Sequence, residues 1–260
     1  MATYLDKILA YHRQRASLDT RSLHDLEREA LSQPSARGFA ASLRQESVER
    51  LAVIAEIKRR SPSKGDLNIG VNPAELAAKY QLGGATCLSV LTDENHFGGS
   101  ILDLQSARAS VALPVLRKDF TVNLRDICDA RIMGADAVLL IAAALSPSEL
   151  KEFHTFATHI GIDSLVEIHD EQELDFALAA NATLVGVNQR DLVTFSVDHE
   201  RAVRMGGVIP ADVVRVAESG VRGHDDAVSL RGAGYDAILV GESLVTSSDP
   251  VESLKSLRVA

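Results

Sequence analysis

The sequence predicts an α/β fold, a single (β/α)8 (TIM) barrel that follows a short N-terminal helical extension. Short aliphatic runs alternate with amphipathic helical windows from Leu51 onward, and eight such runs are present. Most of these runs lack polar alternation, as expected of parallel strands that are buried on both faces. The chain has 260 residues, and an α/β barrel typically fills about 250 residues as one domain.

A doubly wound open sheet is the main alternative to the barrel. It would have a glycine-rich turn after its first strand, whereas this chain has Lys58-Arg59-Arg60-Ser61 at that place. Eight units joined by right-handed crossovers close most economically into a barrel. The barrel is therefore the favoured interpretation.

Residues 1–45 have the pattern of amphipathic helices rather than of a separate domain. Apolar residues recur at helical spacing in two windows, and a third short helix is expected over residues 39–44; the recurring residues are Leu5, Ile8 and Leu9, then Leu23, Leu26 and Ala30. These helices have no second core to fill, so we expect the extension to pack on a barrel formed by residues 46–260. We also expect its removal to impair substrate binding more than folding.

Strands and helices of the barrel carry separate signals. The expected strands are 52–58, 86–91, 114–118, 137–142, 164–168, 184–188, 213–218 and 237–240. Helix start signals are Asn72-Pro73, Ser146 with Glu149, and Asp170 with Glu173. Glycine ends several helices just before the next strand, where it supplies the left-handed conformation, as at Gly83-Gly84, Gly134 and Gly234.

Composition argues against several classes of protein. A net charge of -9 and a pI near 5.4 disfavour nucleic-acid binding, which requires clustered positive charge. The longest apolar run, 137–145, spans nine residues, and about 20 are needed to cross a bilayer. The N-terminus lacks a secretory signal, and the two cysteines are expected to be reduced thiols. We expect a cytoplasmic protein without nucleic-acid or membrane partners; the sequence does not determine its oligomeric state, and a monomer is the default expectation.

Charged and polar side chains gather where the predicted strands end, which is where functional residues lie in such barrels. Each charge alone could be a solvated loop residue or a structural ion pair. A buried charge is costly unless it is paired, so their convergence on one rim is hard to explain by packing. Residues two apart in a strand share a face, so the first strand can direct two charges into the barrel mouth. The strand-end residues are Glu56 and Lys58, Lys118, Glu167, Asn188 with Arg190, and Glu218 with Ser219.

Two glycines suggest a phosphate site. Gly220 follows the seventh strand and Gly241 the eighth, and barrels often bind phosphate with their last two loops. A tight turn would use either glycine equally well, but their paired position favours phosphate. Motifs for other chemistries, such as HExxH or GxGxxG, are absent. No histidine pair has convincing ligand spacing with a carboxylate, so we expect no metal site. We expect His154 and His159 on a helix surface and interpret His169 as structural.

Eight stretches of the chain form a specific combined pattern: 54–58, 61–65, 88–93, 115–120, 166–169, 186–192, 217–221 and 240–244. In these stretches the chain resembles the indole-3-glycerol phosphate synthase family. The resemblance runs from the N-terminal helices to the last helix, and no active-site residue of the family is replaced. It also implies that the N-terminal helices pack over the barrel and help to complete the substrate site.

The resemblance implies a reaction of tryptophan biosynthesis. The family closes 1-(2-carboxyphenylamino)-1-deoxyribulose 5-phosphate to indole-3-glycerol phosphate and releases carbon dioxide and water. Lys118 would be the acid, while Glu167 and Lys58 would serve the loss of water, although which lysine serves which step stays open. Further implied roles are carboxylate binding by Arg190 with Lys58, positioning by Glu56, Asn188, Glu218 and Ser219, and phosphate binding by Ser61, Gly220, Gly241 and Glu242. No cofactor is implied, and the partner is a small phosphorylated substrate.

Two other functions remain as alternatives. A phosphoribosylanthranilate isomerase would need a cysteine and an aspartate at strand ends, but Cys87 lies at a strand start and Cys128 within a helix. A barrel that serves only as a binding scaffold would be expected to lose some rim charges, and none is missing. Basic residues on the same rim would attract an anionic substrate despite the net charge; they are Lys58, Arg59, Arg60, Lys64, Arg117, Lys118 and Arg190.

Overall fold

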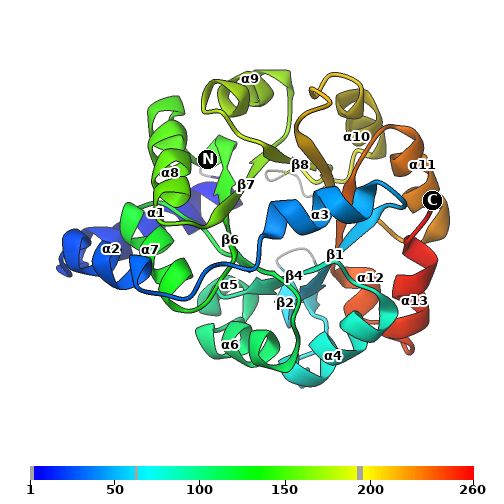
Figure 1. The fold of residues 1–260 in the computed structure, drawn as a ribbon, viewed down its shortest axis with the longest axis horizontal. Helices are drawn as coiled ribbons and strands as arrows, with labels where there is room; N and C mark the ends of the chain where they lie inside the picture. Colours follow the sequence, from blue (N-terminus) through cyan, green and yellow to red (C-terminus); the bar gives the residue numbers. More distant parts are fainter. Residues whose placement is uncertain (1–2, 62–63, 192–195) are drawn as a thin grey trace.

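The eight expected strands form a closed parallel barrel, which confirms the predicted architecture (Figure 1). The computed structural model describes residues 3–61, 64–191 and 196–260. Neighbouring strands around the barrel follow the order β1, β10, β9, β8, β7, β6, β5, β4 and back to β1. Their bounds are β1 Ala52–Ile57, β4 Cys87–Leu91, β5 Val115–Lys118, β6 Ala137–Ile141, β7 Asp163–Ile168, β8 Leu184–Asn188, β9 Val214–Glu218 and β10 Ala237–Val240.

Helices surround the barrel and connect its strands (Figure 1). In chain order they are α1 Tyr4–Ser17, α2 Leu23–Leu31, α3 Phe39–Ser47, α4 Pro73–Gly83, α5 Glu94–Phe97, α6 Ile101–Ser110, α7 Leu124–Ile132, α8 Pro147–His159, α9 Glu171–Ala179, α10 His199–Gly206, α11 His224–Gly232, α12 Glu242–Val245 and α13 Pro250–Leu257, with a 3-10 turn η1 at Ala142–Ala144. None of the helices within the described ranges is long and apolar enough to cross a membrane.

The helix caps largely agree with the sequence. Asn72 caps α4, and Ser146 with Glu149 forms a complete capping box on α8. Asp170 caps α9 by accepting from the Glu173 backbone N–H, but the second half of the box differs. The Glu173 carboxylate accepts instead from the backbone N–H of His169 at 2.7 Å.

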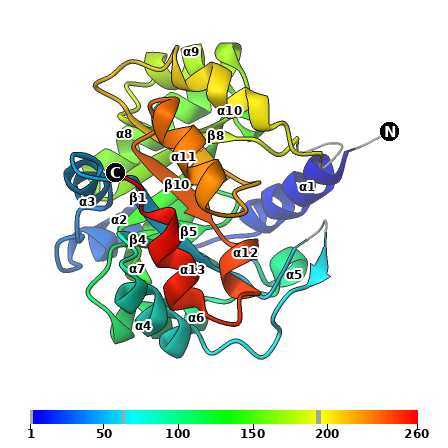
Figure 2. The same ribbon diagram turned by 90° about the vertical axis from the view of Figure 1, so that its right-hand side faces the viewer.

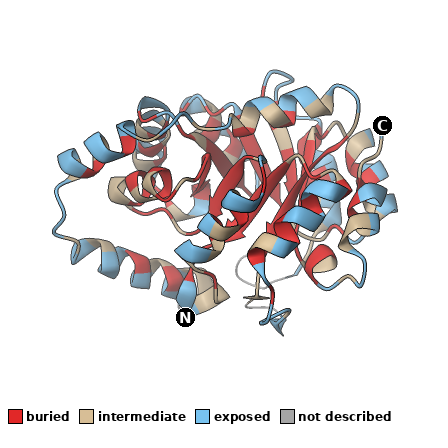
Figure 3. Cartoon of the chain, turned by 60° about the horizontal axis from the view of Figure 1, so that its bottom comes forward, coloured by how far each residue is buried: buried red, intermediate tan, exposed pale blue. Residues whose placement is uncertain are grey.

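Two hydrophobic cores hold the barrel, and Figure 3 shows its strands as buried. The larger one lies between the strands and the surrounding helices. The smaller one fills the barrel interior with side chains such as Ile54, Leu116 and Leu165, all fully buried. The outer faces of the helices are exposed, so each helix is amphipathic, as the sequence pattern predicts.

The N-terminal helices lie at opposite ends of the barrel (Figure 2). Helix α3 closes the end where the strands begin: Phe39 and Leu43 are completely buried and belong to the interior core. Helix α1 lies at the other end, over the carboxyl ends of the strands, and α2 packs against α7. The N-terminal helices thus pack into the cores of the barrel, α3 into the interior core and α2, through Leu26 and Ala30, into the larger one.

A two-stranded hairpin follows β1 and was not expected from the sequence. Strands β2 Arg60–Ser61 and β3 Gly65–Asp66 pair antiparallel beside the barrel mouth. Strands of two residues have no detectable periodicity, which explains the omission. Pro62 and Ser63, and Leu192 in a later quoted stretch, lie outside the described residues.

Candidate active site

A cavity of about 880 Å³ opens at the carboxyl ends of the strands. All twelve residues proposed from the sequence as site residues line it: Glu56, Lys58, Ser61, Lys118, Glu167, Asn188, Arg190, Glu218, Ser219, Gly220, Gly241 and Glu242. The strand register explains part of this convergence, since Asn188 of β8 lies beside Glu218 of β9. The fold thus brings the proposed residues together, while their roles stay predictions.

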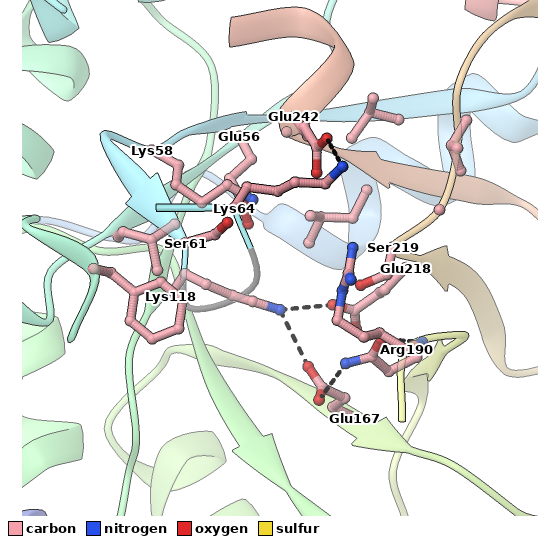
Figure 4. Close-up of a pocket in the computed structure, with 18 of the residues that line it drawn as sticks. Glu56, Lys58, Ser61, Lys64, Lys118, Glu167, Arg190, Glu218, Ser219 and Glu242 are labelled. Carbon is pink, nitrogen blue, oxygen red and sulfur yellow. Dashed lines mark hydrogen bonds and ion pairs between the residues drawn. The ribbon is translucent and has the colours of Figure 1, made fainter. Parts of the chain in front are cut away.

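Lys118 lies between two carboxylates in this cavity (Figure 4). Its Nζ donates to Glu218 Oε2 at 2.7 Å and to Glu167 Oε2 at 3.1 Å. Burial favours the neutral amine, but the two carboxylates outweigh burial and raise the pKa of Lys118 above its usual value. Lys118 is therefore an ammonium at neutral pH.

The pKa values of these two carboxyl groups are shifted in opposite directions. Burial acts to raise the pKa of Glu167, but the charges of Lys118 and His169 outweigh it and hold this pKa below its ordinary value. For Glu218, burial and the neighbouring carboxylates prevail over Lys118 and raise the pKa to about 7. Carboxyl groups whose pKa values are driven apart in one site are typical of acid–base catalysis. Glu167 is therefore ionised at neutral pH, as its predicted role as a base requires.

Glu218 makes stability depend on pH. Its pKa is about 7 in the folded protein and 4.5 when unperturbed, so its stabilising contribution is complete below about pH 4.5 and is lost as pH rises through 7. We expect Glu218→Gln to remove this loss. The unfolding free energy of the variant minus that of wild type should therefore be about 3 kcal/mol more favourable at pH 8 than at pH 4. Chemical denaturation at both pH values measures it. Glu252→Gln on the exposed face of α13 is the control; equal pH dependence of Glu218→Gln and wild type would contradict the pKa.

Glu56 and Lys58 form a second ion pair on the opposite side of the cavity (Figure 4). Lys58 Nζ lies 2.6 Å from Glu56 Oε1, and Glu56 is almost fully buried. A Cβ atom on Gly241 would overlap the Glu56 carboxylate. Gly241 is therefore required for this pair to fit, a function that the sequence did not reveal beside the proposed phosphate contact.

The loop after β9 has a strained backbone. Ser219 and Gly220 have φ values of 65° and 74°, in the left-handed region that a serine rarely adopts. Gln189 Nε2 donates to the Ser219 carbonyl at 2.7 Å and helps to hold this conformation. Non-glycine residues in this region cluster at ligand sites, which supports an anion-binding role for the turn.

The hairpin after β1 reaches the loop after β10. Lys64 Nζ lies 3.7 Å from Glu242 Oε1, and both side chains line the cavity (Figure 4). Ser61 lines the same side. This end of the cavity therefore combines a cation, a hydroxyl and the glycine turns that a phosphate group requires.

Apolar residues at the other end of the cavity were not among the proposed site residues. Tyr4, Leu5 and Ile8 of α1 line it together with Phe97 and Phe120. Phe120 follows Lys118-Asp119 within one of the quoted stretches, so the sequence did contain its signal. The contribution of α1 agrees with the expectation that the extension helps to complete the site.

A buried histidine–aspartate cluster attaches α1 to the barrel mouth. His12 Nε2 lies 2.8 Å from Asp93 Oδ2, and His96 Nδ1 lies 2.9 Å from the same oxygen. Burial alone would raise the pKa of Asp93, but these hydrogen bonds hold it below its usual range. The sequence gave no sign of this grouping because His12 and Asp93 are 81 positions apart. The short distances are those of hydrogen bonds.

Comparison with known proteins agrees with this geometry. A family model described as indole-3-glycerol phosphate synthase matches residues 5–257. The chain belongs to this family. A Streptomyces coelicolor protein, indole-3-glycerol phosphate synthase 2, is 52% identical over 228 residues, which cover 88% of this chain and 87% of the relative. The Mycolicibacterium vanbaalenii synthase is 45% identical over 263 residues and covers 100% of this chain and 95% of its own.

A distant structural likeness concerns the fold alone. A thiamine phosphate pyrophosphorylase from Pyrococcus furiosus superposes with a TM-score of 0.60 at 14% identity, covering 82% of this chain and 95% of the other. It confirms the barrel architecture. Family membership, in contrast, rests on the family model and on the sequence relatives.

Proposed function

We propose that the cavity carries out the ring closure of the indole-3-glycerol phosphate synthase family, with Lys118 as the first general acid and Glu167 as the base. The family's enzymes are decarboxylating lyases of tryptophan biosynthesis, and this chain is one of them. The observation that carries the residue assignment is the buried ammonium of Lys118, hydrogen-bonded to two carboxylates with opposite pKa shifts.

Ring closure begins when the aromatic carbon that bears the carboxylate attacks the C2 carbonyl of the ribulosyl chain. Negative charge develops on the carbonyl oxygen, and Lys118 donates a proton to it. A positioned acid is typically worth about 10²- to 10⁴-fold in rate. Carbon dioxide then leaves with its bonding electrons remaining in the ring, which restores aromaticity without a further proton transfer.

The second half of the reaction removes the C2 hydroxyl as water. Glu167 takes a proton from C1, the carbon–carbon double bond forms, and a lysine protonates the departing hydroxyl. We assign this step to Lys58, and its ammonium, which lies across the cavity beside Glu56, supports the assignment. Two protons are donated and one is removed, so each turnover consumes one proton, in balance with the carboxylate lost as carbon dioxide. These steps require no cofactor because the substrate carries its own leaving groups.

The two ends of the cavity orient the substrate. The aromatic ring fits the apolar end, where α1 and Phe120 lie, and Arg190 with Lys58 would bind the carboxylate. The phosphate fits the opposite end, at Ser61, Glu242 and the turns of Gly220 and Gly241. Asn188, Glu218 and Ser219 would position the lysines and the ribulosyl hydroxyls.

Phosphate should bind at the turns of Gly220 and Gly241. We expect inorganic phosphate and sulfate to inhibit competitively with substrate, because backbone N–H groups at these turns would hold the anion. Inhibition kinetics measure this, with chloride at equal ionic strength as the control. A crystal soaked in sulfate with both turns empty would contradict the prediction.

The activity itself has a direct test. The protein is incubated with 1-(2-carboxyphenylamino)-1-deoxyribulose 5-phosphate, and indole absorbance is followed with time. Appearance of indole supports ring closure. An isomerase or an inert scaffold would give no indole signal, so either result decides between the proposed function and its alternatives.

A further inference from the structure

His169 lies next to Glu167 but outside the cavity. It directly follows β7, and its Nε2 lies 3.9 Å from Glu167 Oε1. This Nε2 is buried and has no hydrogen-bond partner among the residues that the structure describes. Glu167 lines the cavity and His169 does not. Glu167, the proposed base, therefore lies between the cavity and the imidazole of His169.

Glu173 determines the protonation of the ring. Its Oε2 lies 3.0 Å from His169 Nδ1 and also accepts the backbone N–H of His169. A carboxylate can only accept, so Nδ1 carries a proton. A neutral ring would then direct the Nε2 lone pair at a second carboxylate, Glu167, which is repulsive. A proton on Nε2 makes the same contact attractive, so the arrangement favours the imidazolium.

Charges on every neighbouring element act on this ring. Glu167 on β7 and Glu173 on α9 favour the cation, and Arg201 on α10 opposes it. Burial lowers the pKa of His169, but the hydrogen bond to Glu173 and the charge of Glu167 outweigh burial and raise it above its ordinary value. Lys118 lies on the far side of Glu167, on its other oxygen. Glu167 is thus placed between two cations.

The two cations differ in what the reaction does to them. In the proposed function, on which this inference rests, Lys118 gives up its proton while Glu167 must stay a carboxylate for the later step. At that moment the buried base loses its nearest positive charge, with Glu218 close by. We propose that His169 is a positioning residue that keeps a positive charge behind Glu167 and holds this carboxylate ionised while Lys118 is neutral.

Two variants separate charge from structure. In His169→Asn the side-chain amide replaces Nδ1 and can still donate to Glu173, but the positive charge is lost. In Glu173→Gln the amide oxygen can still accept from His169, while the charge that favours the imidazolium is removed. His159→Asn on α8 is the matched control, because His159 is exposed and pairs with Glu27 away from the cavity.

The pH profile of kcat is the first readout. Without the imidazolium, Glu167 takes up a proton at a higher pH, so the acid limb of kcat should move up by roughly one pH unit in His169→Asn and by less in Glu173→Gln. At pH values below the acid limb, kcat of His169→Asn should be about tenfold lower than that of wild type. KM should be nearly unchanged, since His169 does not line the cavity. The limb of His159→Asn should coincide with that of wild type. An unshifted limb, or an equal loss of kcat at every pH, would overturn the inference.

Titration of the histidine by NMR is the second readout, and it needs no turnover. The pKa of His169 should lie above the ordinary value near 6.5 in the full chain and should fall in both Glu173→Gln and Glu167→Gln. A value at or below 6.5 in wild type would overturn the inference even if ring closure is confirmed. Absence of indole formation together with a raised pKa would reject the proposed function and leave the charge pair intact.

Discussion

Lys118→Met should lower kcat by about 10²- to 10⁴-fold, with little change in KM. Methionine keeps the length and the apolar stem of lysine but has no proton to donate. If Lys118 acts in the transition state, the loss falls on kcat; if it only binds the substrate carboxylate, KM rises with kcat nearly intact. Steady-state kinetics on purified variant and wild type distinguish the two results. Near wild-type values of both constants would contradict the acid assignment.

The structure indicates that Lys118→Met also destabilises the folded protein. Lys118 pairs with both Glu167 and Glu218, which are almost fully buried. Removal of one partner of a buried ion pair costs about 3–5 kcal/mol, unless a carboxylate takes up a proton instead. We therefore expect the variant to lose more stability than wild type between pH 5 and pH 8, and near-ultraviolet circular dichroism should accompany the kinetics. Lys151→Met, on the exposed face of α8, is the control for the loss of a lysine.

Much of the barrel could be predicted because its strands are buried on both faces. Runs such as Ala137–Ile141 contain apolar residues only, and the structure shows them as strands within one or two positions of the expected bounds. The same topology brings strand ends together, so the strand-end positions alone predict most of the proposed site residues, whereas Ser61 came from the family resemblance. Local sequence patterns are therefore sufficient to predict a site residue whose role depends on its position along a strand.

Contacts between distant segments had no such local signal. The pattern of α3 is that of an ordinary surface helix, yet Phe39 and Leu43 close the barrel interior. His169 is close to Glu167 and Glu173 along the chain, but only the folded structure shows that its Nε2 is buried beside the Glu167 carboxylate. Gly241 resembled a turn glycine, whereas the Glu56 carboxylate occupies the space where its side chain would be. In each case tertiary packing, rather than local propensity, decides the role.

Two truncations of the N-terminus should have opposite outcomes. Deletion of residues 1–34 removes α1 and α2 and leaves α3 complete. We expect this protein to fold and to have a KM raised roughly tenfold or more, equivalent to about 1.4 kcal/mol of lost binding, because Tyr4, Leu5 and Ile8 no longer line the apolar end of the cavity.

Deletion of residues 1–45 should instead prevent folding, contrary to the expectation from the sequence. The cut falls inside α3 and removes Phe39 and Leu43, each with no exposed surface. Loss of a buried phenylalanine costs about 3–5 kcal/mol and loss of a buried leucine about 2–5 kcal/mol, whereas a domain is stable by only about 5–15 kcal/mol. Thermal unfolding of both truncations measures the difference, and Phe39→Ala in the full chain tests the same contact without a cut. A protein lacking residues 1–45 that unfolds as cooperatively as the full chain would show that α3 only covers a barrel that is stable without it.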